Sequence, residues 1–128
     1  MSNPFIKRLA LLLGVLCVTF LGSSSFLFWI SEHLNFQSKF ANEQTGIFDQ
    51  MRTRALQSSS PADIADCLGY VFNYYPSGTK QKSGSNLDYV VERHRTTVMR
   101  DIIAHLRQTT GQDLGKQPAP WIQKYGKS

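Results

Sequence analysis

The sequence predicts an all-α protein in which one N-terminal transmembrane helix precedes a small helical domain of about three helices, with an irregular C-terminal tail docked on it. An uncharged apolar run of 22 residues extends from Leu9 to Ile30, close to the 20 or so residues that a helix needs to cross the hydrocarbon of a bilayer. After it, apolar residues recur at helical spacing over 61–75 and 87–109. Apolar and polar residues nowhere alternate for long enough to predict a strand.

The 128 residues and their charges bound what the chain can be. We expect four segments: a short cytoplasmic N-terminus over residues 1–8, a signal anchor over 9–30, a juxtamembrane helix over 31–57 and a small helical domain with its tail over 58–128. The net charge of +5 is spread along the chain, whereas nucleic-acid binding needs a concentrated basic face, so no nucleic acid is expected as a partner. Cys17 and Cys67 form no disulfide framework, and Cys67 is expected to be a buried apolar side chain.

The apolar run fits a retained anchor better than a cleaved signal peptide. Two basic residues precede it, and Ser23 and Ser25 lie where a signal peptidase needs small residues, so cleavage after Ser25 remains an alternative that would yield a secreted soluble protein. Cleavage there would leave the five large apolar residues 26–30 at the new terminus, although mature termini are usually polar. Trp29 lies at the end of the run, where an interfacial aromatic residue is favoured.

Charge asymmetry predicts the orientation of this anchor. Lys7 and Arg8 precede the run, whereas the twenty residues after it contain one lysine and three acidic residues. The positive-inside rule therefore predicts a cytoplasmic N-terminus and an exported domain, periplasmic or extracellular in a bacterium. Ala10 and Gly14 have the spacing of a small-residue contact between membrane helices, which leaves open both self-association through the anchor and packing in lipid alone.

The first helix after the anchor, over 31–57, has an uneven pattern. Phe40, Phe48 and Met51 come close to helical spacing. Gly46 weakens the middle of the helix by about 1 kcal/mol relative to alanine, which leaves open a break at Thr45-Gly46.

The next helix begins at a clear boundary in the sequence. Ser60 can cap it, and Pro61 suits its first position because the missing N–H would have no acceptor there. We expect the helix to end before Pro76. One stripe of it is expected to be buried, and consists of Ile64, Cys67, Leu68, Val71 and Tyr75.

A polar loop and a long helix follow. Residues 77–85 contain glycines, serines and lysines and predict a flexible loop. Asn86 is expected to cap the helix over 87–109, and Gly111 to end it in the left-handed conformation. The apolar stripe of this helix consists of Leu87, Val91, Val98, Ile102 and Leu106.

The C-terminal tail contains Pro118 and Pro120, which predict irregular structure rather than helix. Leu114 and Trp121 are expected to dock on the preceding helices. The tail over 110–121, after Leu106-Arg107, resembles the T-G-x-D-x-G-x-x-P-x-x-W tail of uncharacterised small membrane-anchored bacterial proteins, which also ends some HEAT-repeat proteins. The resemblance covers roughly a sixth of the chain. It implies a helical domain with a docked C-terminal hook and no catalytic residues; the repeated helix pairs of a HEAT array are missing here.

Three side chains of the long helix could carry chemistry. His94, Asp101 and His105 project to a similar side of it, and Asp101 and His105 lie one turn apart. His94 lies about 16 Å from His105 along the axis, too far to share one ion, and two ligands do not make a zinc site. The interpretation we favour is a polar flank with an Asp–His pair at the surface, so no metal or cofactor is predicted. The competing class is a small exported hydrolase or metal-dependent enzyme that uses these three residues.

Basic side chains predict an interaction surface. The loop over 77–85 lacks the Gly-Lys-Ser/Thr context of a phosphate-binding loop, but its lysines can contact anionic headgroups, and the arginines of the long helix can form a solvated face or dock an acidic partner. The residues of this predicted surface are Lys80, Lys82, Arg93, Arg95, Arg100 and Arg107.

Together these patterns predict a single-pass membrane protein with a non-enzymatic binding or scaffolding role at the cell envelope. Its expected partners are the lipid bilayer and another envelope protein or a second copy of the chain.

Overall fold

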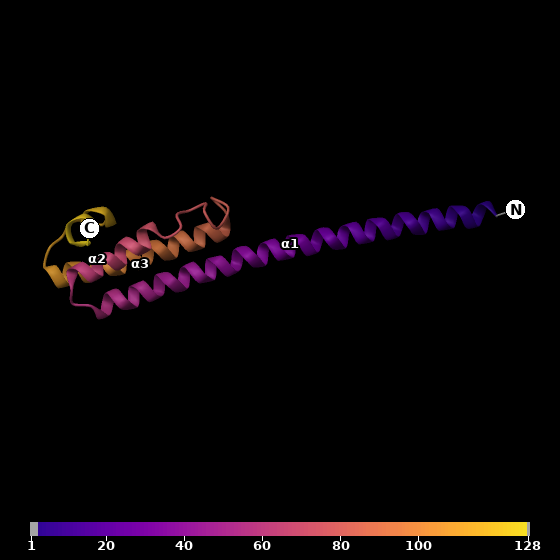
Figure 1. Ribbon diagram of the computed structural model, residues 1–128. Coiled ribbons are helices and arrows are strands. Elements are labelled where there is room, and N and C mark those ends of the chain that lie inside the picture. Colours follow the sequence, from indigo (N-terminus) through magenta and orange to yellow (C-terminus); the bar gives the residue numbers. More distant parts are fainter. Residues whose placement is uncertain (1–2, 128) are drawn as a thin grey trace. The chain divides into compact units, whose positions relative to one another are not determined.

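A computed structural model describes residues 3–127 as four helices, with no strand in that range. Helix α1 spans Pro4–Gln57, α2 spans Pro61–Asn73, α3 spans Asn86–Thr110 and α4 spans Pro118–Tyr125 (Figure 1). The all-α prediction with one long apolar N-terminal helix is therefore confirmed. The chain divides into two compact units, Met1–Phe36 and Gln37–Ser128, which we call the N-terminal and the C-terminal unit and describe separately.

The N-terminal unit is a stretch of α1 whose apolar side chains are exposed. Its most apolar 18-residue window has a mean hydropathy of 2.1 and is 0% buried. The helix continues through the small residues 22–25, where Ser23 Oγ donates to the carbonyl of Thr19 at 2.8 Å and Ser25 Oγ to that of Leu21 at 2.9 Å. By length and composition this segment could cross a membrane, and a signal sequence would have the same properties.

In the C-terminal unit, α1 runs without a break through Thr45 and Gly46, so the break that the sequence left open is not present. Thr45 Oγ1 donates to the carbonyl of Ala41 at 3.1 Å. The next turns bury Phe48 and Ala55 completely, at 0% exposure. This part of α1 therefore forms one wall of the domain core.

Helix α2 begins as the sequence predicts. Ser60 Oγ accepts a hydrogen bond from the Asp63 amide at 3.4 Å, and Pro61 occupies the first turn. The predicted buried stripe is confirmed except at Tyr75, which is 42% exposed. That assignment was wrong because the helix ends at Asn73, ahead of a proline that cannot continue it.

Helix α3 differs from prediction at its first residue. Ser85, not Asn86, is the N-cap, since Ser85 Oγ accepts from the Asp88 amide at 3.2 Å. At the other end, Gly111 has φ 67° and its amide donates to the carbonyl of Arg107 at 2.9 Å. The predicted left-handed stop is therefore confirmed.

The prediction that the tail is irregular was wrong for residues 118–125, which form α4. Pro118 and Pro120 both lie in its first turn, where backbone N–H groups have no intrahelical acceptor, so prolines cost little there. Trp121 is 0% exposed and belongs to the same hydrophobic core as Leu106, and Leu114 is partly buried against it. The core of the C-terminal unit consists of Ala41, Phe48, Ala55, Ile64, Cys67, Leu68, Val71, Val91, Val98, Ile102, Ile103, Leu106 and Trp121.

A buried arginine on α3 joins the helices. Arg95 is 4% exposed. Its Nη1 donates to the carbonyl of Val71 at 2.6 Å, its Nη2 to that of Tyr75 at 2.7 Å and its Nε to Glu92 at 3.1 Å. The last carbonyls of a helix have no intrahelical donor, so the guanidinium satisfies the end of α2. The same group lies 4.7 Å from the ring centroid of Phe48 on α1.

Replacing Arg95 by alanine is expected to lower the free energy of unfolding by about 3 kcal/mol, because the buried carbonyl of Val71 and the partly buried carbonyl of Tyr75 lose a charged donor. Urea unfolding of the detergent-solubilised chain, followed by circular dichroism, measures the change. The control is Arg93→Ala on an exposed position of the same helix, expected within about 0.5 kcal/mol of wild type. Equal effects of the two substitutions would contradict this role of Arg95.

Glycine-to-alanine changes are expected to have opposite signs at two positions. Gly115 has φ 88°, where an added Cβ is strained, so Gly115→Ala should destabilise by about 1–2 kcal/mol. Gly46 lies inside α1, and a Cβ there meets nothing within 4 Å, so Gly46→Ala should stabilise by about 0.5–1 kcal/mol. The same unfolding measurement checks both, and two shifts of one sign would disprove the assignment of these conformations.

Candidate functional site

The three candidate catalytic side chains each contact a different partner outside α3. His94 Nε2 lies 3.2 Å from Asp49 Oδ1, and His105 Nε2 lies 2.9 Å from the Ser58 carbonyl. Asp101 lies 3.5 Å from an Arg52 nitrogen and 3.6 Å from an Arg100 nitrogen. Residues 3–127 contain no group of three His, Cys, Asp or Glu side chains arranged to hold a metal ion. Through these contacts, His94 and Asp101 join α3 to α1, and His105 joins α3 to the α1–α2 connection.

The six residues of the predicted basic surface do not form one exposed surface. Arg95 is buried, so its assignment to an interaction surface was wrong; the guanidinium is used inside the fold. Arg107 binds the tail. Arg93 and Lys82 are exposed, and the side chain of Arg100 is 73% exposed. Of the six, these three are the exposed ones, and Arg100 also pairs with Asp101.

The residues of the tail motif form one hydrogen-bonded cluster. Arg107 Nε donates to Asp113 at 2.8 Å, and its Nη2 donates to the carbonyl of Gly115 at 2.7 Å. Asp113 also accepts from the Gly115 amide at 2.9 Å. Trp121 Nε1 donates to the same Gly115 carbonyl at 2.9 Å. The motif therefore has a structural explanation: each of these residues fixes the turn that leads from α3 into α4.

The loop over 77–85, predicted to be flexible, is organised around Asp88. The Asp88 carboxylate accepts from Ser77 Oγ at 2.6 Å and from the amides of Gly84 at 3.0 Å and Gly78 at 3.3 Å. The Ser77 hydrogen bond is the main cause that lowers the pKa of Asp88. Asp88 was not predicted to organise the loop, because nothing in its local sequence shows that a loop folds back onto it.

A second set of hydrogen bonds, besides those of Asp88, holds this loop against α1. Gln81 Nε2 donates to Gln44 Oε1 at 2.6 Å, and Gln44 Nε2 donates to the carbonyl of Tyr75 at 3.3 Å. Both glutamines are buried, at 4% and 2% exposure. Tyr75 has φ 39°, a conformation that is uncommon for a bulky residue, and its carbonyl is held by Gln44 and Arg95 together.

In this loop, the side chain of Lys80 lies against two aromatic rings. Its Nζ is 4.5 Å from the ring centroid of Phe40 and 4.3 Å from that of Tyr75. With Glu43, Gln44 and Tyr74 these residues line a small depression of about 40 Å³. We call this set the Lys80 site. This site was not predicted from the sequence, because Phe40 lies on α1, far from Tyr75 and Lys80 along the chain.

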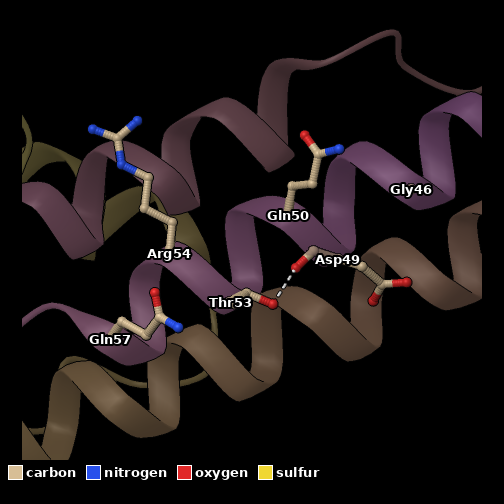
Figure 2. A pocket seen from close by; sticks show the side chains of 6 residues that line it. All are labelled: Gly46, Asp49, Gln50, Thr53, Arg54 and Gln57. Carbon is tan, nitrogen blue, oxygen red and sulfur yellow. Dashed lines mark hydrogen bonds between the residues drawn. The ribbon is translucent and has the colours of Figure 1, made fainter.

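A wider depression lies along α1 in the same unit. Figure 2 shows its six lining residues, Gly46, Asp49, Gln50, Thr53, Arg54 and Gln57, with Thr53 Oγ1 bonded to the carbonyl of Asp49. All six belong to one helix. No second element contributes a lining residue, so this surface offers no enclosed site of the kind that binds small molecules.

In comparisons with known proteins, no protein-family model, no curated protein and no solved structure matches the chain.

Replacing Asp88 by asparagine should destabilise the protein by about 2 kcal/mol at neutral pH, because the loop donors lose their charged acceptor. A carboxyl group whose pKa is lowered by folding stabilises the protein above its unfolded pKa of about 3.9, and this contribution is lost as the pH falls through the lowered pKa. The difference in the free energy of unfolding between wild type and Asp88→Asn should therefore become smaller as the pH falls.

Urea unfolding of both proteins at several pH values measures the gap. Asp63 and Asp113 also have lowered pKa values, through Lys127 and through the Gly115 amide respectively. Their contributions are common to both proteins and cancel in the comparison. A gap that stays constant from neutral pH to about pH 2 would contradict the role of the Asp88 charge.

Proposed function

We propose that the chain is a single-pass membrane protein whose C-terminal unit is a non-enzymatic binding or scaffolding module at the cell envelope. The observation that carries the proposal is the exposure of the apolar segment: large side chains such as Phe20 and Phe28 are 72% and 69% exposed. Apolar surface of this extent does not stay in contact with water. A lipid bilayer is the partner that covers every side of such a helix at once.

The internal hydrogen bonds of the small residues support an uncleaved anchor. Thr19 Oγ1 donates to the carbonyl of Val15 at 3.0 Å, and Ser23 and Ser25 bond in the same way. Hydroxyl groups satisfied by their own helix are tolerated in lipid. The positions of Lys7 and Arg8 favour a cytoplasmic N-terminus and an exported C-terminal unit. The resemblance of the tail favours a bacterial envelope.

The binding module presents aromatic and basic side chains on α3. Tyr89 and Val90 are 65% and 57% exposed, and Arg93 and Arg100 follow Tyr89 at spacings of four and eleven residues, which lie on one side of a helix. We call Tyr89, Arg93 and Arg100 the α3 face. Tyrosine and arginine are the residues enriched where proteins bind one another, and the two cations favour an acidic partner. The tail acts as a hook that closes the domain, with Trp121 in the hydrophobic core and Leu114 packed against it.

The anchor is tested by the intact mass of protein extracted from membranes with detergent, beside an alkaline carbonate wash of the same membranes. The expected result is a full-length mass and a protein that resists the wash, because an apolar helix of this length partitions into the bilayer. A control in which Val18 and Leu21, near the middle of the apolar run, are both replaced by lysine should appear in the wash, since each central lysine costs about 3 kcal/mol in a membrane helix. A mass lacking residues 1–25 with protein in the wash would overturn the anchor and favour a secreted soluble protein.

A further inference from the structure

We propose that the Lys80 site is a binding site for a quaternary ammonium group, and that the side chain of Lys80 occupies it until such a ligand displaces it. The inference names a ligand class for the binding role proposed above and rests on that role. It is drawn from the C-terminal unit alone, so its test does not depend on whether the N-terminal segment is an anchor.

The first argument is the chemistry of the walls. The ring of Phe40 comes from α1 and that of Tyr75 from the segment just after α2, and the two centroids lie 4.5 and 4.3 Å from the same ammonium nitrogen. Ring faces attract cations through their quadrupole, and two or more rings around one cation are the arrangement by which proteins recognise choline-like groups. Glu43 lines the same depression and adds a carboxylate that favours a cation over an anion or a neutral ligand.

The second argument is that the Tyr75 wall of the site is held in place without Lys80. Tyr75 keeps its left-handed backbone through the hydrogen bonds of its carbonyl with Arg95 and Gln44. Its ring also packs edge-on against Tyr74, with centroids 4.7 Å apart. A ring that is fixed by other contacts does not have to be ordered by the ligand, which lowers the cost of binding.

The third argument concerns the lysine. Its two chain neighbours are tied: the amide and the hydroxyl of Thr79 both donate to the carbonyl of Pro76, and Gln81 bonds to Gln44. The side chain of Lys80 can therefore leave by rotation about its own bonds while the loop stays in position. The space left beside it, about 40 Å³, holds roughly one water molecule. A trimethylammonium group fits only in place of the lysine.

A quaternary ammonium group suits the site better than a second primary ammonium. The ring faces that contact the cation offer no lone-pair acceptor, so a primary ammonium gives up hydrogen bonds with water when it lies against them. A quaternary ammonium has no N–H group, so it loses no hydrogen bonds to water when it enters the site. The ligand is thus a free choline-like solute or the headgroup of a choline lipid, which share this chemistry.

The test is a titration of the full chain with choline chloride in maltoside micelles, which carry no choline, with sodium chloride as the ionic-strength control. Lys80→Ala is expected to bind choline about tenfold more tightly than wild type, because the competing cation is gone. Lys82→Ala is the matched control, an exposed lysine of the same loop, and should bind as wild type does. Adding Phe40→Leu to Lys80→Ala should weaken binding by about tenfold, since leucine fills the volume without a ring face. Circular dichroism checks that each variant is folded.

Three results would overturn the proposal: no choline binding by folded Lys80→Ala, equal gains in Lys80→Ala and Lys82→Ala, or binding that does not respond to Phe40→Leu. Lys80→Gln, which keeps most of the length of the side chain without its charge, should reproduce the gain if Lys80→Ala fails to fold. Nanodiscs distinguish the sources: phosphatidylcholine discs should compete with free choline if the ligand is a headgroup, and phosphatidylglycerol discs should not. Failure of the anchor would appear in the carbonate wash and leave this titration unchanged.

Discussion

The C-terminal unit depends most on the buried guanidinium of Arg95. A helix that ends inside a small domain leaves its last carbonyls without donors, and burying such groups without partners is costly. Arg95 supplies donors to the carbonyls of Val71 and Tyr75 from α3 and lies against the ring of Phe48 on α1. One side chain thus holds the end of α2, the middle of α3 and the domain part of α1 together. It also explains why an arginine is buried between these helices.

The polar groups around this contact follow the same logic. The carbonyl of Tyr75 is shared by Arg95 and Gln44, and Gln44 accepts from Gln81. The Asp88 carboxylate on α3 accepts hydrogen bonds from the Ser77 hydroxyl and from the amides of Gly78 and Gly84 in the loop. No buried side-chain nitrogen or oxygen among the described residues lacks a hydrogen-bond partner. Because the loop is tied at both sides, it can hold Lys80 over two aromatic rings, and it is this placement that gives the domain a candidate ligand site.

The tail repeats the arrangement at the opposite end of α3. Arg107 and Asp113 bind each other and the backbone of Gly115, and Trp121 bonds to the same glycine while its ring enters the core. The spacing of the tail motif therefore reflects a turn in which a positive φ, an ion pair and an indole N–H meet at one residue. This accounts for the motif without any catalytic role for its residues.

The sequence by itself determined helices α2 and α3, the apolar segment of α1, the cap at Ser60 and the stop at Gly111. These depend on residues close together in the chain: periodicity, a proline in the first turn and a glycine at a left-handed position. The irregular tail was predicted wrongly, because prolines tolerated in a first turn look the same in sequence as prolines that break a helix. Only the tertiary structure decided that Arg95 is buried rather than exposed, that Asp88 organises a loop and that Lys80 meets Phe40. Each of these contacts joins groups from separate elements, and their energies depend on burial and distance, which local spacing does not encode.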